Sequence, residues 1–211
     1  MKVLIVHSSL GGSESVTRDL CETAIWRLKE ISPGLVLTER DLGLSPHPHL
    51  DEAWWRAAAK PAAERSADEQ ACLRLSDDIC REVIEADVVM VGVPMWNFSI
   101  PSALKAWIDH LVRSGVTFRY GPKGPEGLLS PDKTVFVFEA TGGDYVNPEL
   151  ARLNHAGPYI RQIFGFLGVK NAEVITASGT AYRKTGALEE ARAEIFKRFQ
   201  TFGKVVGTAR P

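Results

Sequence analysis

One continuous stretch constrains the fold most strongly. It consists of an apolar run at residues 88–93 (VVMVGV), a loop at 94–101 (PMWNFSIP) and a periodic segment at 103–113. The apolar run is short, rich in β-branched residues and closed by a proline, which is typical of a parallel strand covered on both faces. Pro101 fits the first turn of a helix, where its missing N–H would lack a partner anyway. The sequence therefore predicts a strand, a loop and a helix in succession.

The loop at 94–101 has the composition of a ligand-binding loop. A strand–loop–helix unit places its loop at the carboxyl end of the strand, where open α/β sheets bind their ligands. Met95, Trp96 and Phe98 offer flat, polarisable surface, while Asn97 offers both a hydrogen-bond donor and an acceptor. This combination suits a planar heteroaromatic ring with a polar edge. The alternative is that Trp96 and Phe98 are core residues that happen to lie on a loop.

A hydroxyl-rich loop follows the first predicted strand. Residues 2–7 (KVLIVH) form an apolar run, and residues 8–17 (SSLGGSESVT) lead into a segment with helical period. The free N–H groups and dipole of a helix N-terminus favour an anion, and Ser9, Ser15 and Thr17 add donors. Because the loop lacks both the GxGxxG pattern and the lysine of a P-loop, it suits a phosphate monoester. The alternative is that Ser13 or Ser15 only caps the helix.

A third loop follows another predicted buried strand, at residues 134–139 (TVFVFE). It reads Ala140, Thr141, Gly142 and Gly143. Two adjacent glycines after a strand allow backbone N–H groups to approach a ligand closely. The alternative is a tight turn without a ligand.

The rest of the chain completes an alternating pattern of strands and helices. Further strands are predicted at residues 35–41 and 172–176, and further helices at 67–85, 159–167 and 188–206, with loops at 42–66 and 115–129. Five strands alternating with helices make an α/β fold, a doubly wound parallel sheet with helices on both faces. No linker or repeat divides the chain, so we expect a single domain over residues 1–211.

Composition narrows the class of partner. A net charge of −1 and a pI near 6.5 give no electrostatic footprint for nucleic acid or an anionic membrane. Without a membrane-length apolar run or a signal peptide, the expected location is cytoplasmic. Three cysteines without metal-ligand spacing favour reduced, buried thiols. A metal site could be read from His47, His49 and Asp51. The intervening prolines and the lack of a second ligand cluster predict that no metal binds there.

The three loops converge if the sheet has the strand order 2-1-3-4-5. In that order the carboxyl ends of the first, third and fourth strands are neighbours. A phosphate monoester at one end and a planar ring at the other describe flavin mononucleotide (FMN) better than other common ligands.

Several motifs resemble one family over nearly the whole chain. HSSLGGSESVTRDL, PMWNFSIPSALKAWIDHLVRSGVTFRY and GPKGPEGLL are similar to the FMN-dependent NADH:azoreductases, also called NADH:quinone oxidoreductases, of the flavodoxin-like class. The resemblance implies a phosphate site at Ser9, Ser15, Val16 and Thr17, a ring site at Pro94, Met95, Trp96, Asn97 and Phe98, and a pyrimidine-edge site at Ala140, Thr141, Gly142 and Gly143. The last loop commonly reads Ser-Arg-Gly-Gly in that family. Here Ala140 and Thr141 replace the Ser-Arg pair, so the basic arginine side chain is absent.

The resemblance also implies an activity and an assembly. We expect an FMN-dependent NAD(P)H oxidoreductase that reduces quinones or aromatic azo compounds by two electrons in a ping-pong cycle, with NADH or NADPH as donor. Asn97, Phe98 and Tyr120 are the expected catalytic residues, in a homodimer with FMN at the interface, where Phe118 or Phe164 could also line the shared pocket. The competing hypotheses are a one-electron carrier, although such proteins tend to be strongly acidic, and a non-enzymatic interaction module of the same fold.

Overall fold

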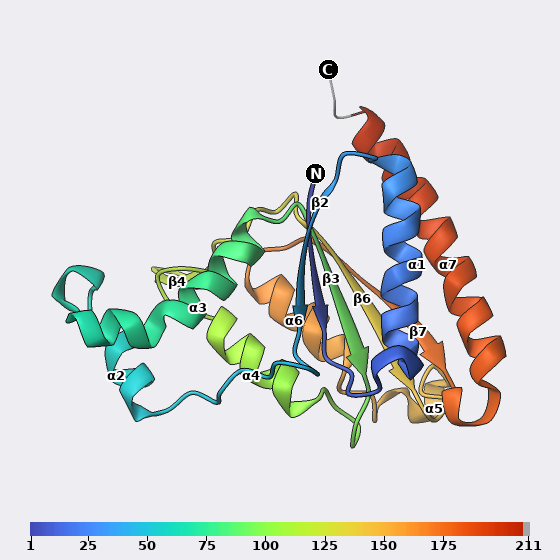
Figure 1. Cartoon of the computed structure of the whole chain (residues 1–211), viewed down its shortest axis with the longest axis horizontal. Coiled ribbons are helices and arrows are strands. Elements are labelled where there is room, and N and C mark those ends of the chain that lie inside the picture. Colours follow the sequence, from blue (N-terminus) through green and yellow to red (C-terminus); the bar gives the residue numbers. More distant parts are fainter. Residues whose placement is uncertain (209–211) are drawn as a thin grey trace.

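The computed structural model describes residues 1–208, with side chains described to residue 202, and has a parallel sheet at its centre (Figure 1). All five predicted strands are present: β1 (Lys2–His7), β2 (Val36–Asp41), β3 (Val88–Pro94), β6 (Thr134–Thr141) and β7 (Asn171–Ser178). They pair in parallel in the order β2-β1-β3-β6-β7, which confirms the predicted order 2-1-3-4-5. Six of the seven residues of β3 are buried, as expected for a strand covered on both faces.

Helices cover both faces of this sheet and bury a separate apolar layer on each. Figure 1 shows α1 (Val16–Ile31) and α7 (Thr180–Thr208) on one face, and α3 (Ala67–Glu85), α4 (Ser102–Leu111) and α6 (Gly157–Phe166) on the other. Alternate residues of the strands point to opposite faces, so Phe136 packs on the α1–α7 side while Val135 and Val137 pack on the α4–α6 side.

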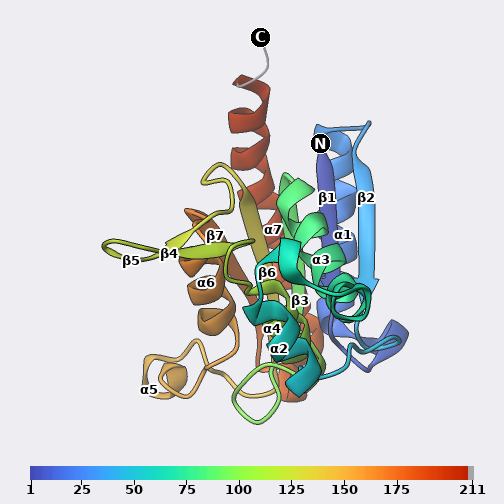
Figure 2. The same cartoon turned by 90° about the vertical axis from the view of Figure 1, so that its left-hand side faces the viewer.

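The segment at 42–66, which the sequence predicted to be irregular, contains a helix. α2 (Glu52–Ala59) begins at Asp51, whose side chain accepts a hydrogen bond from the Trp54 N–H at 2.8 Å, and a 3-10 turn follows at Ala62–Glu64. In α2, Ala57 is the one buried residue, because the helix projects from the sheet and packs mainly against α3 (Figure 2). Trp54 packs against the His110 ring of α4 and the Arg113 guanidinium just after that helix, whereas Trp55 is exposed. So short a helix with so little buried surface leaves almost no periodic signal.

The segment at 115–129 is a hairpin and not the predicted loop. β4 (Phe118–Gly121) and β5 (Gly124–Gly127) pair antiparallel, and the hairpin projects beyond α6 (Figure 2). The glycines in this segment suggested a loop, but at Gly127 glycine allows the hairpin to pack closely against the Leu167 backbone, which a Cβ would overlap.

Two helical details also differ from prediction. The short helix α5 (Pro148–Ala151) was not expected, and α7 begins well before residue 188, with non-helical angles at Arg183 (φ −144°, ψ 47°).

Cys21 and Cys80 are buried as expected, but Cys72 is exposed. Within residues 1–208, no helix combines the length and apolarity needed to cross a membrane. The described side chains also form no cluster of three or more His, Cys, Asp or Glu that could hold a metal ion.

Candidate functional site

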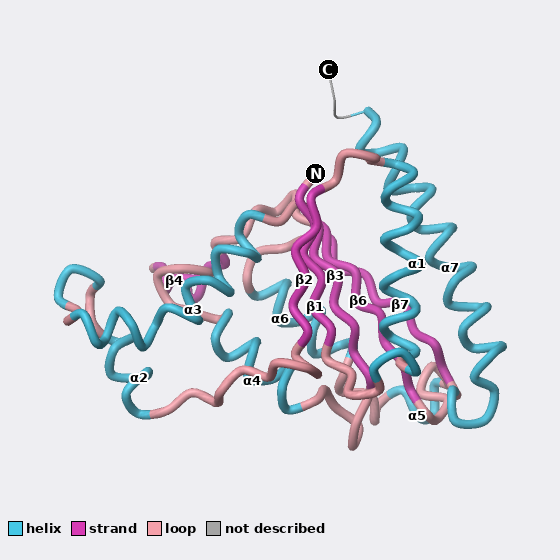
Figure 3. The backbone as a smooth tube through the Cα atoms, viewed as in Figure 1, coloured by secondary structure: helices cyan, strands magenta, loops and turns pink. Residues whose placement is uncertain are grey.

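Three loops meet at one edge of the sheet because β1, β3 and β6 are neighbours and run in the same direction (Figure 3). Two hydrogen bonds tie their strands together near this edge. Ser8 Oγ donates to the Gly92 carbonyl at 2.7 Å, and the Met95 N–H donates to the Ala140 carbonyl at 2.8 Å. The structure therefore brings the predicted site residues of all three loops to one edge.

The loop after β1 presents donors at the start of α1. Ser15 caps this helix, since its Oγ accepts the Arg18 N–H at 3.3 Å and lies 3.1 Å from Thr17 Oγ1. Neither the Val16 nor the Thr17 N–H has an acceptor among the described residues. Ser9 is nearly buried beside them, and its Oγ accepts the Gly11 N–H at 3.2 Å. Ser15 is thus a helix cap, as the alternative held, but the free N–H groups next to it still form a cradle for an anion.

The guanidinium of Arg18, beside this cradle, is already paired. Arg18 forms an ion pair with Asp41 and lies 3.6 Å from a carboxylate oxygen of Glu39. Although burial opposes it, the hydrogen bond from Arg18 lowers the pKa of Asp41. Burial, followed by the nearby Arg18 charge, lowers the pKa of His7, so this histidine is neutral at pH 7. Lys184 also lies at this loop, since its Nζ donates to the Glu14 carbonyl at 3.4 Å. The attraction for an anion therefore comes from N–H groups, hydroxyls and this ammonium group.

The loop after β3 forms a strained, two-residue turn. Trp96 and Ser99 exchange two backbone hydrogen bonds of 2.9 Å, and between them Asn97 and Phe98 have φ of 48° and 68°. A left-handed conformation costs a non-glycine residue roughly 1–2 kcal/mol, and asparagine tolerates it better than phenylalanine. Trp96 is 42% exposed and Phe98 48%, so the interpretation that they are core residues is wrong. Strained backbone that keeps aromatic side chains exposed to solvent is typical of a functional turn.

The loop after β6 offers two further N–H groups. The carbonyls of Gly142 and Gly143 accept hydrogen bonds from the N–H groups of Ala181 and Gly179, at 3.2 and 3.1 Å. Their own N–H groups have no acceptor among the described residues. Thr141, which is buried, donates from Oγ1 to the Gly143 carbonyl at 2.9 Å and fixes the shape of the loop.

Two residues that the sequence analysis did not single out support the strained turn. The ring of Tyr145 meets the Phe98 ring edge to face, with centroids 6.1 Å apart. The His155 N–H donates to the Phe98 carbonyl at 2.8 Å. No sequence signal marks either residue, because each acts through a contact distant along the chain.

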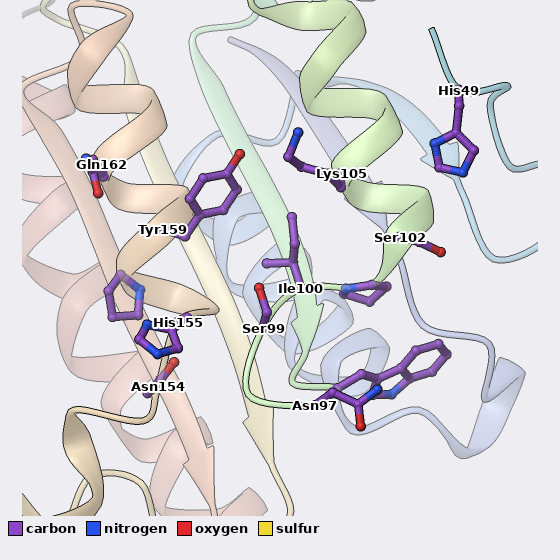
Figure 4. A pocket seen from close by; sticks show the side chains of 13 residues that line it. His49, Asn97, Ser99, Ile100, Ser102, Lys105, Asn154, His155, Tyr159 and Gln162 are labelled. Carbon is purple, nitrogen blue, oxygen red and sulfur yellow. The ribbon is translucent and has the colours of Figure 1, made fainter.

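A cavity of about 720 Å³ opens beside the turn, between α4 and α6 (Figure 4). Its lining is His49, Trp96, Asn97, Ser99, Ile100, Pro101, Ser102, Lys105, Asn154, His155, Pro158, Tyr159 and Gln162. Of the predicted site residues, Trp96 and Asn97 reach it. Burial raises the pKa of Tyr159, so its hydroxyl is protonated at neutral pH.

Two of the residues expected near the ring lie elsewhere in the single chain. Tyr120 is on the hairpin, 76% exposed, with its ring against Phe118 at 5.4 Å between centroids. Phe164 is fully buried in the core, so its expected place in a pocket lining is wrong.

Comparisons with known proteins agree on one group. A family model described as a flavodoxin-like fold matches residues 1–199. The chain is 44% identical to FMN-dependent NADH:quinone oxidoreductase 2 of Pseudomonas fluorescens Pf-5, over 84% of this chain and 87% of that protein. It is 39% identical to an FMN-dependent NADH:quinone oxidoreductase of Rhizobium leguminosarum bv. trifolii, over 86% and 89%.

Solved structures give the same result. An azoreductase from Bacillus anthracis str. Sterne superposes with a TM-score of 0.82 at 30% identity, covering 93% of this chain and 99% of that one. An FMN-dependent NADH-azoreductase from Bacillus anthracis str. Ames Ancestor, in complex with FMN, superposes with a TM-score of 0.87 at 25% identity, covering 96% and 99%.

Proposed function

The chain belongs to the flavodoxin-like family of the FMN-dependent NADH:quinone oxidoreductases, and from this we propose that it is an FMN-dependent NAD(P)H oxidoreductase that reduces quinones and aromatic azo compounds. The observation that carries the proposal is a set of N–H groups without an acceptor in the described part of the chain, at Val16, Thr17, Gly142 and Gly143, with the exposed aromatic turn between them. The relatives are named for NADH, which favours NADH over NADPH as donor.

The residues present fit FMN. At the end of β1, the hydroxyls of Ser9, Ser15 and Thr17 and the N–H groups of Val16 and Thr17 would hold the phosphate by charge-assisted hydrogen bonds. The ring would lie against the loop of Pro94, Met95, Trp96, Asn97 and Phe98, and its pyrimidine edge would face Ala140, Thr141, Gly142 and Gly143.

Bound FMN would supply the redox chemistry, which is hydride transfer from NAD(P)H and two-electron reduction of the acceptor. The protein supplies position and charge stabilisation. The N–H groups of Gly142 and Gly143 and the amide of Asn97 would stabilise negative charge at the ring edge without any side chain changing its ionisation. The rigid turn at residues 96–99 would orient the ring, because Phe98 is fixed by His155 and Tyr145.

A second copy of the chain would complete the site. The β4–β5 hairpin projects from the side of the molecule that carries α6 (Figure 2). Tyr120 lies next to the turn of this hairpin and is largely exposed. The cavity between α4 and α6 is large enough to receive an aromatic side chain. We therefore place Tyr120 of one copy at the flavin site of the other, in a homodimer. Dependence on NAD(P)H also favours a cytoplasmic location.

A visible spectrum tests the proposal most directly. The purified protein is reconstituted with FMN and titrated without oxygen, first with NADH and then with NADPH. We expect the flavin bands to bleach in one two-electron step and to return on addition of a quinone such as menadione or an azo dye. Flavin bands that survive both donors would indicate a one-electron carrier, and absence of bound flavin would indicate an interaction module.

A further inference from the structure

A buried carboxylate lies directly before the flavin-edge loop. Glu139 occupies β6 next to Ala140, is 1% exposed and faces the α6 side of the sheet. No Lys, Arg or His among the described residues forms an ion pair with it. Burying a charge is costly unless hydrogen bonds replace its water, so the fold must provide donors for this group.

Three donors surround the carboxylate. Its Oε1 accepts the Gly157 N–H at 2.7 Å, and its Oε2 accepts Asn154 Nδ2 at 3.0 Å and Thr176 Oγ1 at 2.9 Å. Both carboxylate oxygens therefore have hydrogen-bond partners inside the fold. The approach of α6 requires glycine at 157, because a Cβ there would lie 3.1 Å from Glu139 Oε1 and 2.8 Å from Val174 Cγ1.

One of these donors leads to the strained turn. Asn154 also accepts the Ala156 N–H at 2.9 Å through Oδ1, so both ends of its amide are fixed. The next residue, His155, donates its N–H to the Phe98 carbonyl. Asn154 and His155 line the cavity next to the turn (Figure 4). Glu139 thus fixes the corner at residues 154–155, and that corner fixes Phe98.

We propose that Glu139 is a positioning residue for the flavin, which braces the turn at residues 96–99 through Asn154 and His155 and whose buried negative charge lowers the reduction potential of the bound ring. The inference rests on the proposed function. Glu139 precedes Ala140 in the loop proposed for the ring edge, and a negative charge near a ring makes the addition of electrons less favourable. The dipole of α6, which begins at Gly157, acts in the opposite direction.

Three variants separate the two roles. Glu139→Gln keeps the shape and removes the charge. Asn154→Ala keeps the carboxylate and breaks the route to Phe98. Thr176→Val is the matched control, since it also removes one neutral donor to Glu139 Oε2 but lies on β7, away from that route. All are measured as FMN-loaded protein, by the flavin potential against a reference dye and by stopped-flow reduction with saturating NADH.

We expect Glu139→Gln to raise the potential, and Asn154→Ala to leave the potential unchanged while slowing flavin reduction about tenfold, equivalent to 1.4 kcal/mol in the barrier. Thr176→Val should change neither. An unchanged potential in Glu139→Gln would overturn the electrostatic role, and equal rates in Asn154→Ala and Thr176→Val would overturn the brace. Should Glu139→Gln not fold, the Asn154 and Thr176 pair still decides the brace. Wild-type protein that binds no FMN would instead refute the proposed function.

Discussion

At the scale of single residues, Ser15 caps a helix and is also proposed to bind phosphate with the same side chain. Its Oγ accepts the Arg18 N–H as a helix cap, and it also lies 3.1 Å from Thr17 Oγ1 in the anion cradle. Both roles draw on the same property of a helix N-terminus, which is its excess of N–H donors. A capping serine is therefore no argument against a phosphate site; it places a hydroxyl where the N–H groups already point.

Loss of the two hydroxyls should weaken FMN binding. A hydrogen bond to a charged group contributes roughly 1.5–3 kcal/mol, so we expect Ser15→Ala with Thr17→Ala to raise the FMN dissociation constant at least tenfold in a fluorescence titration. Loss of the cap also lowers stability by about 1 kcal/mol, which thermal unfolding records separately. Ser13→Ala, in the same loop but exposed, is the control. An affinity equal to that of the control would remove these hydroxyls from the site.

Asn97 combines an amide with a left-handed backbone, and the two can be separated. Asn97→Gly relieves the backbone and removes the amide, whereas Asn97→Ala removes the amide and adds strain of roughly 1–2 kcal/mol. If the amide stabilises charge on the ring, both variants should reduce flavin slowly in stopped-flow measurements, and only Asn97→Ala should lose thermal stability. A wild-type rate in Asn97→Gly would show that the turn, and not the amide, is what the reaction needs.

At the scale of elements, α2 is held to the body by a cluster around two histidines. Arg40 Nη1 donates to His47 Nε2 at 3.3 Å, and His110 Nε2 donates to the Pro48 carbonyl at 3.0 Å. Trp54 meets the His110 ring edge to face at 6.0 Å between centroids. A guanidinium can donate only to an unprotonated imidazole nitrogen. This attachment therefore requires a neutral His47 whose Nε2 carries no proton.

The cluster predicts a fall in stability with acid. Burial, then the charges of Arg40 and His110, lower the pKa of His47 from 6.5 to about 4, and burial lowers that of His110. Between these values the unfolded chain binds more protons than the folded one, so stability is full above pH 6.5 and is lost as the pH falls towards 4. Thermal unfolding at pH 7.5 and 5.0 should show the loss, and His47→Gln should reduce it. His49→Gln, at an exposed histidine, should leave it unchanged, and an equal pH dependence in both variants would contradict the assignment.

The same scale shows what the sequence could predict. The strands were predicted because β1, β3 and β6 are buried on both faces and read as apolar runs. The positions of the three site loops were then predictable, because each loop directly follows one of these strands and must lie at its carboxyl end. α2 and the β4–β5 hairpin were not predicted, because neither buries a full apolar face and so neither has a periodic sequence pattern. The support given by Glu139, Tyr145 and His155 escaped because it consists of contacts between distant segments.

At the scale of the whole molecule, the two faces of the sheet differ. The α1–α7 face is closed by long helices, and α1 is fixed to α7 by the ion pair of Asp19 with Arg192. The α4–α6 face carries the cavity and the projecting hairpin, on which Phe118 packs against Phe166 and Tyr120. In the homodimer that we propose, the same face of each copy would meet, and each hairpin would enter the cavity of the other copy.

Mixing two variants that are each expected to have lower activity tests whether Tyr120 acts across such an interface. Asn97→Gly and Tyr120→Ala homodimers each carry one lesion in every site. If Tyr120 acts on the neighbouring copy, a mixed dimer has one site with both lesions and one with neither, so random mixing should restore about a quarter of wild-type quinone reductase activity. If Tyr120 acts within its own chain, every site of the mixture keeps one lesion and mixing restores nothing. Subunit exchange is verified by native mass spectrometry before the assay, so that an unchanged activity counts against the shared site.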